Sequence, residues 1–274
     1  MILNAQKLAK LMRIQVARKL ILRFSNKLKL NKSKFNATSI HFRKNNIVLD
    51  KNTYLSCGRD SFLQHSMIYV EGQDNQIIMD NDVELYNVKI RIFGSGNQIR
   101  IGNKCILHDS AIMIRGNKNH IMIGEKFSSY NATFHLEDDR NEVRIGDGTT
   151  CHGRDYRAVN FELCEGSKII VGKDCMFSND IQIRPSDAHS LVDLSGKRLN
   201  PAEDIIIGDH CWICLGVTIL KGTQIPEHTV VGAGAVCTKK YTESYCVLAG
   251  NPAKVVKQSI DWNRKFLWNT NYLQ

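Results

Sequence analysis

One histidine lies in a polar interruption of an otherwise regular, apolar part of the chain. Residues 183–204, IRPSDAHSLVDLSGKRLNPAED, contain His189 and separate two stretches that look alike, IIVGKDCMFSNDIQI and IIIGDHCWICLGVTILKGTQI. An imidazole titrates near neutral pH and can both remove and return a proton during a reaction. The alternative is a loop histidine that only hydrogen-bonds the backbone, and residue type alone does not separate the two.

Two cysteines form a second candidate for chemistry. Cys211 and Cys214 match the C-x-x-C spacing that is typical of redox and metal sites. The chain has no second C-x-x-C that would complete a zinc site. The elements around this motif therefore decide whether it is functional.

Those elements follow an internal repeat. Ile-Gly pairs begin at residues 101, 123 and 145, a constant step of 22 residues, and Met79 ends an earlier copy at the same step. Later copies begin at Val171 and Ile207, as if loops had been inserted. A fixed period of this length is the signature of a solenoid.

A finer period of six residues runs through the last copies. Bulky aliphatic residues recur at this step and form a first column: Ile207, Ile213, Ile219, Ile225 and Val231. A second column, four residues later, contains small or β-branched residues. Six is not a helical period, so an amphipathic helix is excluded. Short strands joined by tight corners fit, with stacked coils sharing one core. Cys211 then becomes a small core residue and Cys214 lies at a turn, which disfavours the redox interpretation.

Charge is concentrated at the beginning of the chain. The net charge is +10, and residues 1–34 contain ten lysines and arginines but no acid, so the remainder is neutral. The longest apolar run in this leader is three residues, too short to span a membrane or form a signal peptide. A basic amphipathic helix on an anionic membrane surface and a helix packed on the body or a neighbouring subunit are both compatible with it. Nucleic acid binding is disfavoured, because no known module accompanies the charges.

The cysteine count bears on the compartment. Nine cysteines are an odd number, and no secretory signal precedes them. Reduced thiols in the cytoplasm are the expectation. With the basic leader, this predicts a cytoplasmic protein that can rest at the inner face of the membrane.

The hexapeptide pattern of residues 166–237, followed by VVGAGAVCTKK and LAGNPAKVV, resembles the left-handed β-helix acyltransferases. The resemblance is nearest to the branch of maltose, galactoside and bacterial polysaccharide O-acetyltransferases. It implies an all-β solenoid, a left-handed parallel β-helix, with acetyl-coenzyme A as co-substrate. It also implies a homotrimer with active sites at subunit junctions. We expect no metal.

We expect four segments. Residues 1–35 form a basic, helical leader, and residues 36–164 form coils with the 22-residue repeat. Residues 165–257 form the hexapeptide coils, which carry an active-site loop at 185–204. Residues 258–274 form a tail, a short helix or strand that covers the open end of the stack.

The family resemblance also implies roles for individual residues. The segment SDAHS matches the family stretch that carries the catalytic base, which places His189 in that role. Asp187 either orients the imidazole or makes an Asx-turn. His210 is a rival base, but its register makes it a corner side chain. Trp212 points outward from the coil, so it lines the active site beside the donor and acceptor or packs in a subunit interface.

Donor binding is expected along the last coils. Gly232, Ala233 and Gly234 offer accessible backbone to a pantetheine arm, and three lysines offer charge to the nucleotide phosphates: Lys239, Lys240 and Lys254. The six-residue step is lost at Val247, which puts the phosphate contacts in doubt.

The predicted function is transfer of acetyl from acetyl-coenzyme A to a hydroxyl of a bacterial surface glycan, such as a capsule, lipopolysaccharide or sialic acid polymer. An acetyltransferase for a small molecule or nucleotide sugar is one alternative. A zinc enzyme of the γ-carbonic-anhydrase kind, which shares the β-helix, is an alternative of another class.

Overall fold

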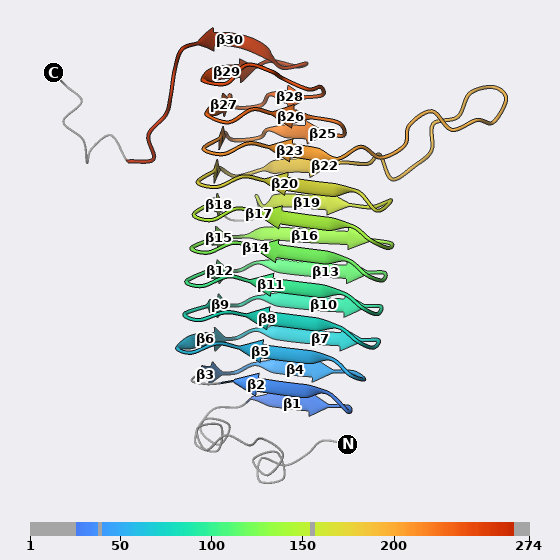
Figure 1. Ribbon diagram of the computed structural model, residues 1–274, viewed down its shortest axis with the longest axis vertical. Coiled ribbons are helices and arrows are strands. Elements are labelled where there is room, and N and C mark those ends of the chain that lie inside the picture. Colours follow the sequence, from blue (N-terminus) through green and yellow to red (C-terminus); the bar gives the residue numbers. More distant parts are fainter. Residues whose placement is uncertain (1–25, 38–39, 154–156, 266–274) are drawn as a thin grey trace.

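Each coil of the chain contributes one short strand to each of three sheets, and the sheets form the sides of a solenoid (Figure 1). The computed structural model describes residues 26–37, 40–153 and 157–265. Within these ranges the ordered elements are strands, and no helix is present. The alternation of buried and exposed residues along each strand turns one row of side chains into the shared core.

The three sheets are named A, B and C in the order in which the chain visits them. Sheet A contains β1 (Lys27–Leu30), β4 (Asn46–Leu49), β7 (Met67–Glu71), β10 (Lys89–Phe93), β13 (Ala111–Arg115), β16 (Ala132–Glu137), β19 (Val159–Leu163), β22 (Ile181–Arg184), β25 (Thr218–Leu220) and β28 (Val236–Cys237). Sheet B contains β2 (Lys34–Ala37), β5 (Tyr54–Cys57), β8 (Gln76–Met79), β11 (Gln98–Ile101), β14 (His120–Ile123), β17 (Glu142–Ile145), β20 (Lys168–Val171), β23 (Ile205–Ile207) and β26 (Gln224–Ile225). Sheet C contains β3 (Ile40–Arg43), β6 (Ser61–Gln64), β9 (Glu84–Tyr86), β12 (Ile106–His108), β15 (Ser128–Tyr130), β18 (Thr150–His152), β21 (Met176–Phe177), β24 (Trp212–Ile213), β27 (Thr229–Val231), β29 (Cys246–Ala249) and β30 (Lys254–Gln258).

Strand register confirms the repeat expected from the sequence. In the lower coils β10 pairs with β13 so that Lys89 lies opposite Ala111, a shift of 22 residues. In the upper coils Ile207 lies opposite Ile225, a shift of 18 residues, or three hexapeptides. The aliphatic column of these hexapeptides is buried throughout the stack.

The glycine of each Ile-Gly pair marks a close approach between coils. A Cβ atom on Gly146 would lie 2.5 Å from the carbonyl carbon of Gly172, one coil above. No side chain fits at that separation, so the corner requires glycine for space. This contact explains the glycine after Ile101, Ile123 and Ile145, whereas the earlier copy has Asp80 after Met79.

Buried asparagines fasten successive coils from the inside. Asn75, Asn97, Asn119 and Asn141 are fully buried and lie 22 residues apart. The side-chain oxygen of Asn119 accepts hydrogen bonds from the backbone N–H and the amide of Asn141, at 2.8 and 3.1 Å. Its own amide donates to Asn97 and to the Asp138 carbonyl. These amides satisfy corner backbone groups that the sheets leave unpaired.

The beginning of the solenoid differs from the expected boundary at residue 36. Strand β1 begins at Lys27, and Leu28, Leu30 and Phe35 pack against the core. The alternation in KLKL has the period of a strand. Its lysines, however, match the charge of the basic leader, and we therefore expected this segment to belong to the leader. Residues 1–25, on which the helical expectation falls, lie outside the described residues. Among the residues described, no helix is long and apolar enough to cross a membrane.

The end of the stack also differs from expectation. Strand β30 turns back antiparallel to β29 and closes the top of sheet C. The tail beyond it runs down the side of the solenoid, as far as residue 265 is described (Figure 1). Arg264 reaches Thr150 and Asp174, several coils below the end. Polar and aromatic partners along this side hold residues 261–264, so the described part of the tail does not cover the open end as expected.

Candidate active site

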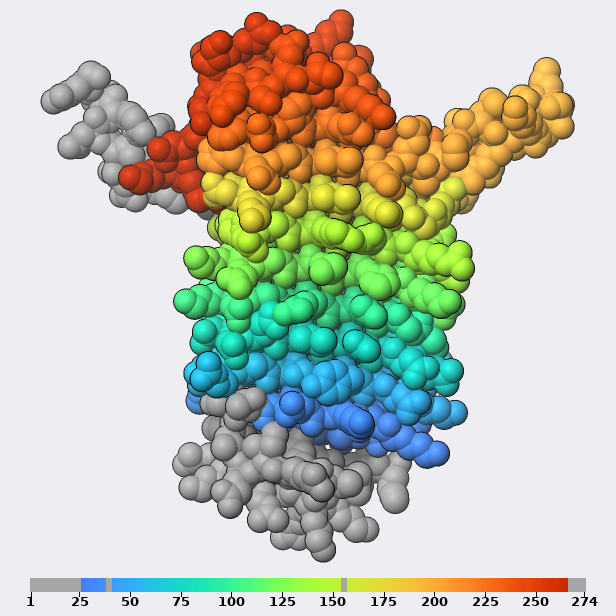
Figure 2. Space-filling view, viewed as in Figure 1, coloured from blue at the N-terminus to red at the C-terminus, as the bar shows by residue number. Residues whose placement is uncertain are grey.

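The polar interruption forms an arm that stands away from the solenoid. Residues 185–204, here called the arm, leave β22 and return at β23, and they project from the body of the molecule (Figures 1 and 2). Their backbone pairs with itself: Val192 bridges Arg198, and a tight turn joins Asp193 to Lys197. The arm is therefore an ordered hairpin.

A bidentate ion pair fixes the root of the arm to the coil below. Both guanidinium nitrogens Nη1 and Nη2 of Arg198 contact the Glu165 carboxylate, at 2.6 and 2.8 Å. The buried Ser186 hydroxyl donates to the same carboxylate. The hydrogen bonds from Arg198, and then from Ser186, lower the pKa of Glu165 to about 2. The carboxylate consequently stays ionised at neutral pH and holds the root from both sides.

Asp187 is a second anchor of the arm, a role that was not expected from the sequence. Its Oδ2 accepts hydrogen bonds from Lys221, at 2.5 Å, and from the Asn200 amide, at 2.7 Å. The Lys221 ammonium, followed by Asn200, holds the pKa of Asp187 below its usual value. Among the described residues, no hydrogen bond links this carboxylate to the His189 ring. Asp187 positions the arm because cationic and amide donors already occupy its oxygen.

His189 sits directly after these anchors. The Asn200 amide donates to its carbonyl oxygen at 2.9 Å, and the Ser186 hydroxyl accepts from the Ala188 N–H at 3.0 Å. Ala188 has a φ of 60°, a left-handed conformation that these contacts maintain. The imidazole is exposed and has no hydrogen-bond partner among the residues that the structure describes. It is therefore placed by a fixed backbone and remains available to a substrate.

A pocket of about 520 Å³ opens beside the root of the arm. Its walls combine acids and bases, including Glu162, Arg184 and Arg198, with Ser190 from the arm itself. Glu162 and Arg184 pair at 2.6 Å, so part of this charge is internally compensated. The walls present hydrogen-bond donors and acceptors of both signs, which suits a hydroxyl-rich ligand.

Trp212 points outward, as expected, but it is distant from the arm within one chain. It lies on β24 in sheet C, whereas the arm leaves on the opposite side of the solenoid (Figure 1). Its indole is half-buried and lies 5.9 Å from the ring of Trp262 in the tail. A residue of its own chain thus partly covers Trp212. The structure does not bring Trp212 and His189 together in a single subunit.

The C-x-x-C motif belongs to the core, which confirms the interpretation from periodicity. Cys211 is fully buried, and its hydrogen bond with Cys175, together with burial, raises its pKa. Burial raises the pKa of Cys214, which follows β24 at a corner, to about 11. Both thiols are protonated at neutral pH and are poor nucleophiles. All nine cysteines are free.

The expected donor residues gather at the last coils, with one correction. Gly232 and Gly234 donate their N–H groups to the carbonyls of Leu248 and Leu215, both at 2.8 Å. These two donors are therefore used by the fold, and the exposed Ala233 presents the remaining backbone N–H of the three. The corner is accessible, but it offers fewer backbone donors than expected.

The three expected lysines are exposed on the same end of the stack. Lys239 and Lys240 follow β28, and Lys254 begins β30. Tyr241 joins their segments, because its hydroxyl donates to the Ala253 carbonyl at 3.1 Å. The structure thus places all three cations around one surface, consistent with binding of phosphates.

Sequence reasoning missed the residues that fix the arm: Asn200, Arg198, Glu165 and Lys221. Asn200 and Arg198 belong to the arm sequence, but their partners lie 13 to 33 residues away. No local motif pairs a carboxylate on one coil with a guanidinium on an inserted hairpin. Only the fold reveals these contacts.

The fold and the arm together define a hexapeptide-repeat solenoid with an inserted histidine loop, and comparison with known proteins agrees. The chain is 35% identical over 111 residues to a polysialic acid O-acetyltransferase of Neisseria meningitidis, covering 40% of this chain and 52% of that protein. It is 39% identical over 97 residues to a polysialic acid O-acetyltransferase of Escherichia coli O1:K1 / APEC, covering 35% of this chain and 31% of that protein. These matches span from about a third to about half of the relatives' length.

A solved structure matches more of the chain. The polysialic acid O-acetyltransferase OatWY superposes with a TM-score of 0.69 and 34% identity, covering 75% of this chain and 95% of that one. Comparison with protein-family profiles found no match. The chain belongs to the left-handed β-helix acyltransferase family, which confirms the resemblance and the fold class expected from the hexapeptides.

Proposed function

We propose that this protein transfers acetyl from acetyl-coenzyme A to a hydroxyl of a bacterial surface glycan. The observation that carries the proposal is an exposed imidazole on a rigidly anchored arm, in a chain that matches almost the whole of a polysialic acid O-acetyltransferase structure. An anionic polymer such as polysialic acid is the acceptor we favour. The chain's similarity to O-acetyltransferases supports this class over a zinc enzyme.

His189 acts as the general base. Its ring nitrogen takes the proton from the acceptor hydroxyl while that oxygen attacks the thioester carbonyl, and the resulting imidazolium returns the proton to the departing thiolate. Acetyl-coenzyme A supplies the thioester. Anchoring through Asp187, Asn200 and Arg198 limits motion of the arm, so that the base is held in one position for both substrates. No covalent acyl-enzyme is required.

The site is completed by a neighbouring subunit in a homotrimer. Within one chain, the arm and Trp212 lie on opposite sides of the solenoid. The indole that meets His189 therefore belongs to a neighbouring subunit and reaches it across an interface. Aliphatic side chains are exposed along the arm: Leu191, Val192, Leu194 and Leu199. Four such residues on a projecting hairpin favour packing against another subunit.

The acceptor is tested by a screen of coenzyme A release. Polysialic acid, a neutral capsular polysaccharide, sialic acid monomer, a nucleotide sugar and a galactoside are compared at equal hydroxyl concentration. We expect kcat/KM to be highest for polysialic acid. Turnover confined to the nucleotide sugar or galactoside would establish the small-molecule alternative, and no acetyl transfer to any acceptor would contradict the proposal.

A further inference from the structure

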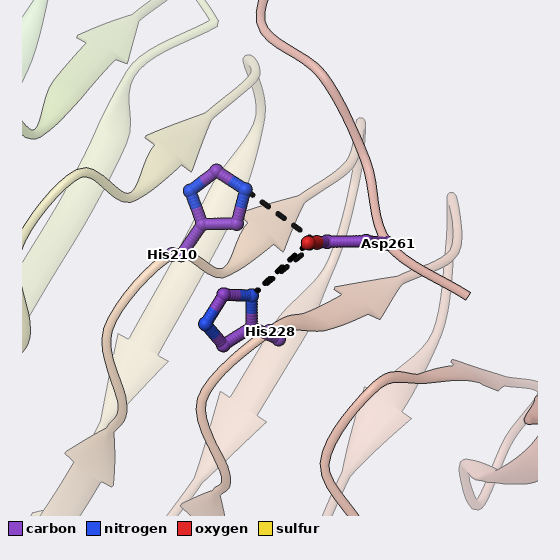
Figure 3. Close-up of side chains that lie close together, drawn as sticks. All are labelled: His210, His228 and Asp261. Atoms are coloured by element: carbon purple, nitrogen blue, oxygen red, sulfur yellow. Dashed lines mark hydrogen bonds and ion pairs between the residues drawn. The ribbon is translucent and has the colours of Figure 1, made fainter. Parts of the chain in front are cut away.

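A cluster of metal-ligating side chains lies on the opposite side of the molecule from the arm. His210 and His228 occupy the same corner of two successive coils, between sheets B and C, and Asp261 approaches them from the tail (Figure 3). Both histidines have left-handed backbones, with φ of 51° and 55°. One ligand atom from each of the three residues lies within 4.8 Å of the other two.

Both ring nitrogens of His210 face oxygen atoms. Its Nδ1 lies 2.6 Å from a carboxylate oxygen of Asp174. Its Nε2 faces two more oxygens, 3.2 Å from the Trp262 carbonyl and 3.5 Å from Asp261. A neutral imidazole has one donor and one acceptor nitrogen. In a neutral His210 ring, the nitrogen without a proton therefore faces the lone pairs of an oxygen and forms no hydrogen bond with it.

The arrangement of Asp174 behind His210 is also that of a metal ligand whose second ring nitrogen is held by a carboxylate. When Asp174 accepts the Nδ1 proton of His210, it fixes the tautomer whose Nε2 can bind a cation, as carboxylates do behind zinc ligands. A tetrahedral zinc at about 2.0 Å from its ligands separates them by about 3.3 Å. The Asp261 carboxylate lies 3.3 Å from His228 Nδ1 and 3.5 Å from His210 Nε2. Asp261 is therefore close to the separation that such an ion needs from each histidine, and the ligand atoms of the two histidines lie within 4.8 Å of each other.

We propose that His210, His228 and Asp261 bind a divalent transition metal of the zinc class, with water or the Trp262 carbonyl as the fourth ligand. Two imidazoles and one carboxylate favour such an ion over calcium or magnesium, which prefer oxygen ligands. This site departs from our expectation of no metal. It is separate from the arm of its own chain, and the inference does not depend on the proposed acetyl transfer.

The ion fastens the tail to the solenoid. Trp262 stacks on His210 with ring centroids 4.5 Å apart, and its indole N–H donates to the His210 carbonyl at 2.8 Å. Next to it, Arg264 reaches Asp174 at 2.9 Å. A metal between the corner and Asp261 therefore holds Trp262 against both His210 and Trp212. The site is structural, joining the tail to the face that carries Trp212.

The test uses the full chain, stripped with chelator and titrated with zinc. We expect one zinc per subunit by elemental analysis, and a cobalt-substituted protein with the absorption of a tetrahedral ion. Asp261→Asn, His210→Gln and His228→Gln each raise the zinc Kd at least tenfold. His120→Gln, a histidine on β14 in sheet B, is the matched control and leaves the Kd unchanged. Circular dichroism confirms that the variants fold, and Asp261→Asn lies outside the repeat.

Amide exchange separates the metal from a plain ion pair. Zinc should protect residues 259–265 of the wild-type protein from exchange at least several-fold over the chelated protein, and should not protect them in Asp261→Asn. The inference is overturned by equal protection with and without zinc, since ion pairs alone then hold the tail. It is also overturned by an absence of zinc binding, or by binding that all three variants retain.

Discussion

At the scale of single residues, the proposed base is separate from the groups that hold it. His189 contributes an exposed ring, while Asp187, Asn200 and Arg198 use their polar atoms to hold the arm together and to fix it to the coils. A general base of this kind accelerates transfer by a factor of about 10²–10⁴. Substitutions should therefore divide into those that abolish chemistry and those that loosen the arm.

His189→Ala should lower kcat by at least a hundredfold and leave the thermal midpoint unchanged, because the exposed ring fills no core volume. Thioester turnover with saturating acceptor measures the effect. His120→Ala, on a different face, is the control and should retain full activity. A variant of His189 that keeps more than about a tenth of the wild-type kcat shows that another group is the base.

Arg198→Gln tests the anchoring of the arm through its pH dependence. The folded pKa of Glu165, about 2, lies below the ordinary 4.5, so its contribution to stability is present above pH 4.5 and is lost as pH falls toward 2. Removing the guanidinium should raise the pKa of Glu165 toward its ordinary value. Carbon NMR of the carboxyl group reports this shift.

The same substitution should change the arm at mildly acidic pH. Near pH 4, amides of residues 186–200 should exchange faster in Arg198→Gln than in the wild type. Lys197→Gln, which removes a neighbouring exposed charge, is the control. Equal exchange in all three proteins would mean that the Glu165 ion pair does not anchor the arm.

Trp212→Ala distinguishes a residue that lines the site from an interface anchor. We expect kcat/KM for the acceptor to fall more than tenfold with the trimer intact, because truncating a half-buried outward ring opens no core cavity. Met176→Ala, the neighbour of Trp212 on sheet C, is the matched control. Sedimentation accompanies the kinetics. Monomers with a loss of several kcal/mol in stability would instead identify Trp212 as an interface anchor.

At the scale of elements, a buried asparagine column joins the lower coils alongside their aliphatic core. Asn119→Ala removes an acceptor of two hydrogen bonds and a donor of two more, and the buried backbone N–H of Asn141 loses its side-chain acceptor. We expect a loss of about 3 kcal/mol in the free energy of unfolding. Urea denaturation measures it, with the exposed Asn87→Ala as control. A loss below about 0.5 kcal/mol would show that water replaces the ladder.

Periodicity made these elements predictable, whereas contacts between distant segments did not. The six-residue column through Ile207 and Ile213 fixes which side chains face inward, and the structure confirms it. Strand β1 was not predicted from the sequence, because the lysines of KLKL resemble the basic leader more than its alternation resembles a strand. The Asp187–Lys221 contact joins an inserted hairpin to a coil 34 residues on, so it depends on a geometry that no local pattern encodes. The position of the tail depends on similar contacts.

At the scale of the whole molecule, a proposed trimer of parallel solenoids would have its three β1 strands, each of which follows a basic leader in sequence, at the same end. Residues 1–25 carry six lysines and arginines and no acid. Three copies together would attract an anionic bilayer more strongly than one, since each cation near such a surface contributes about 1 kcal/mol. We propose that this end contacts the inner membrane face, where glycan precursors are assembled.

Deleting residues 1–25 should leave acetyl transfer to a soluble acceptor unchanged, because β1 begins only at Lys27. Association with anionic liposomes should fall, and association with neutral liposomes should be weak for both proteins. Flotation assays at low and physiological salt measure the difference. Equal flotation of the full and shortened proteins on anionic liposomes would remove the membrane role from this segment.

The constant register of the lower coils has a genetic consequence. Because Lys89 pairs with Ala111 and the same step repeats at the next coil, a duplication or deletion of 22 codons at any phase within this region inserts or removes one whole coil. Such an event moves no contact of the arm, since Glu165, Asp187 and Lys221 all lie above it. Unequal recombination can thus change the distance between the active site and the basic end in steps of one coil, while the chemistry stays the same.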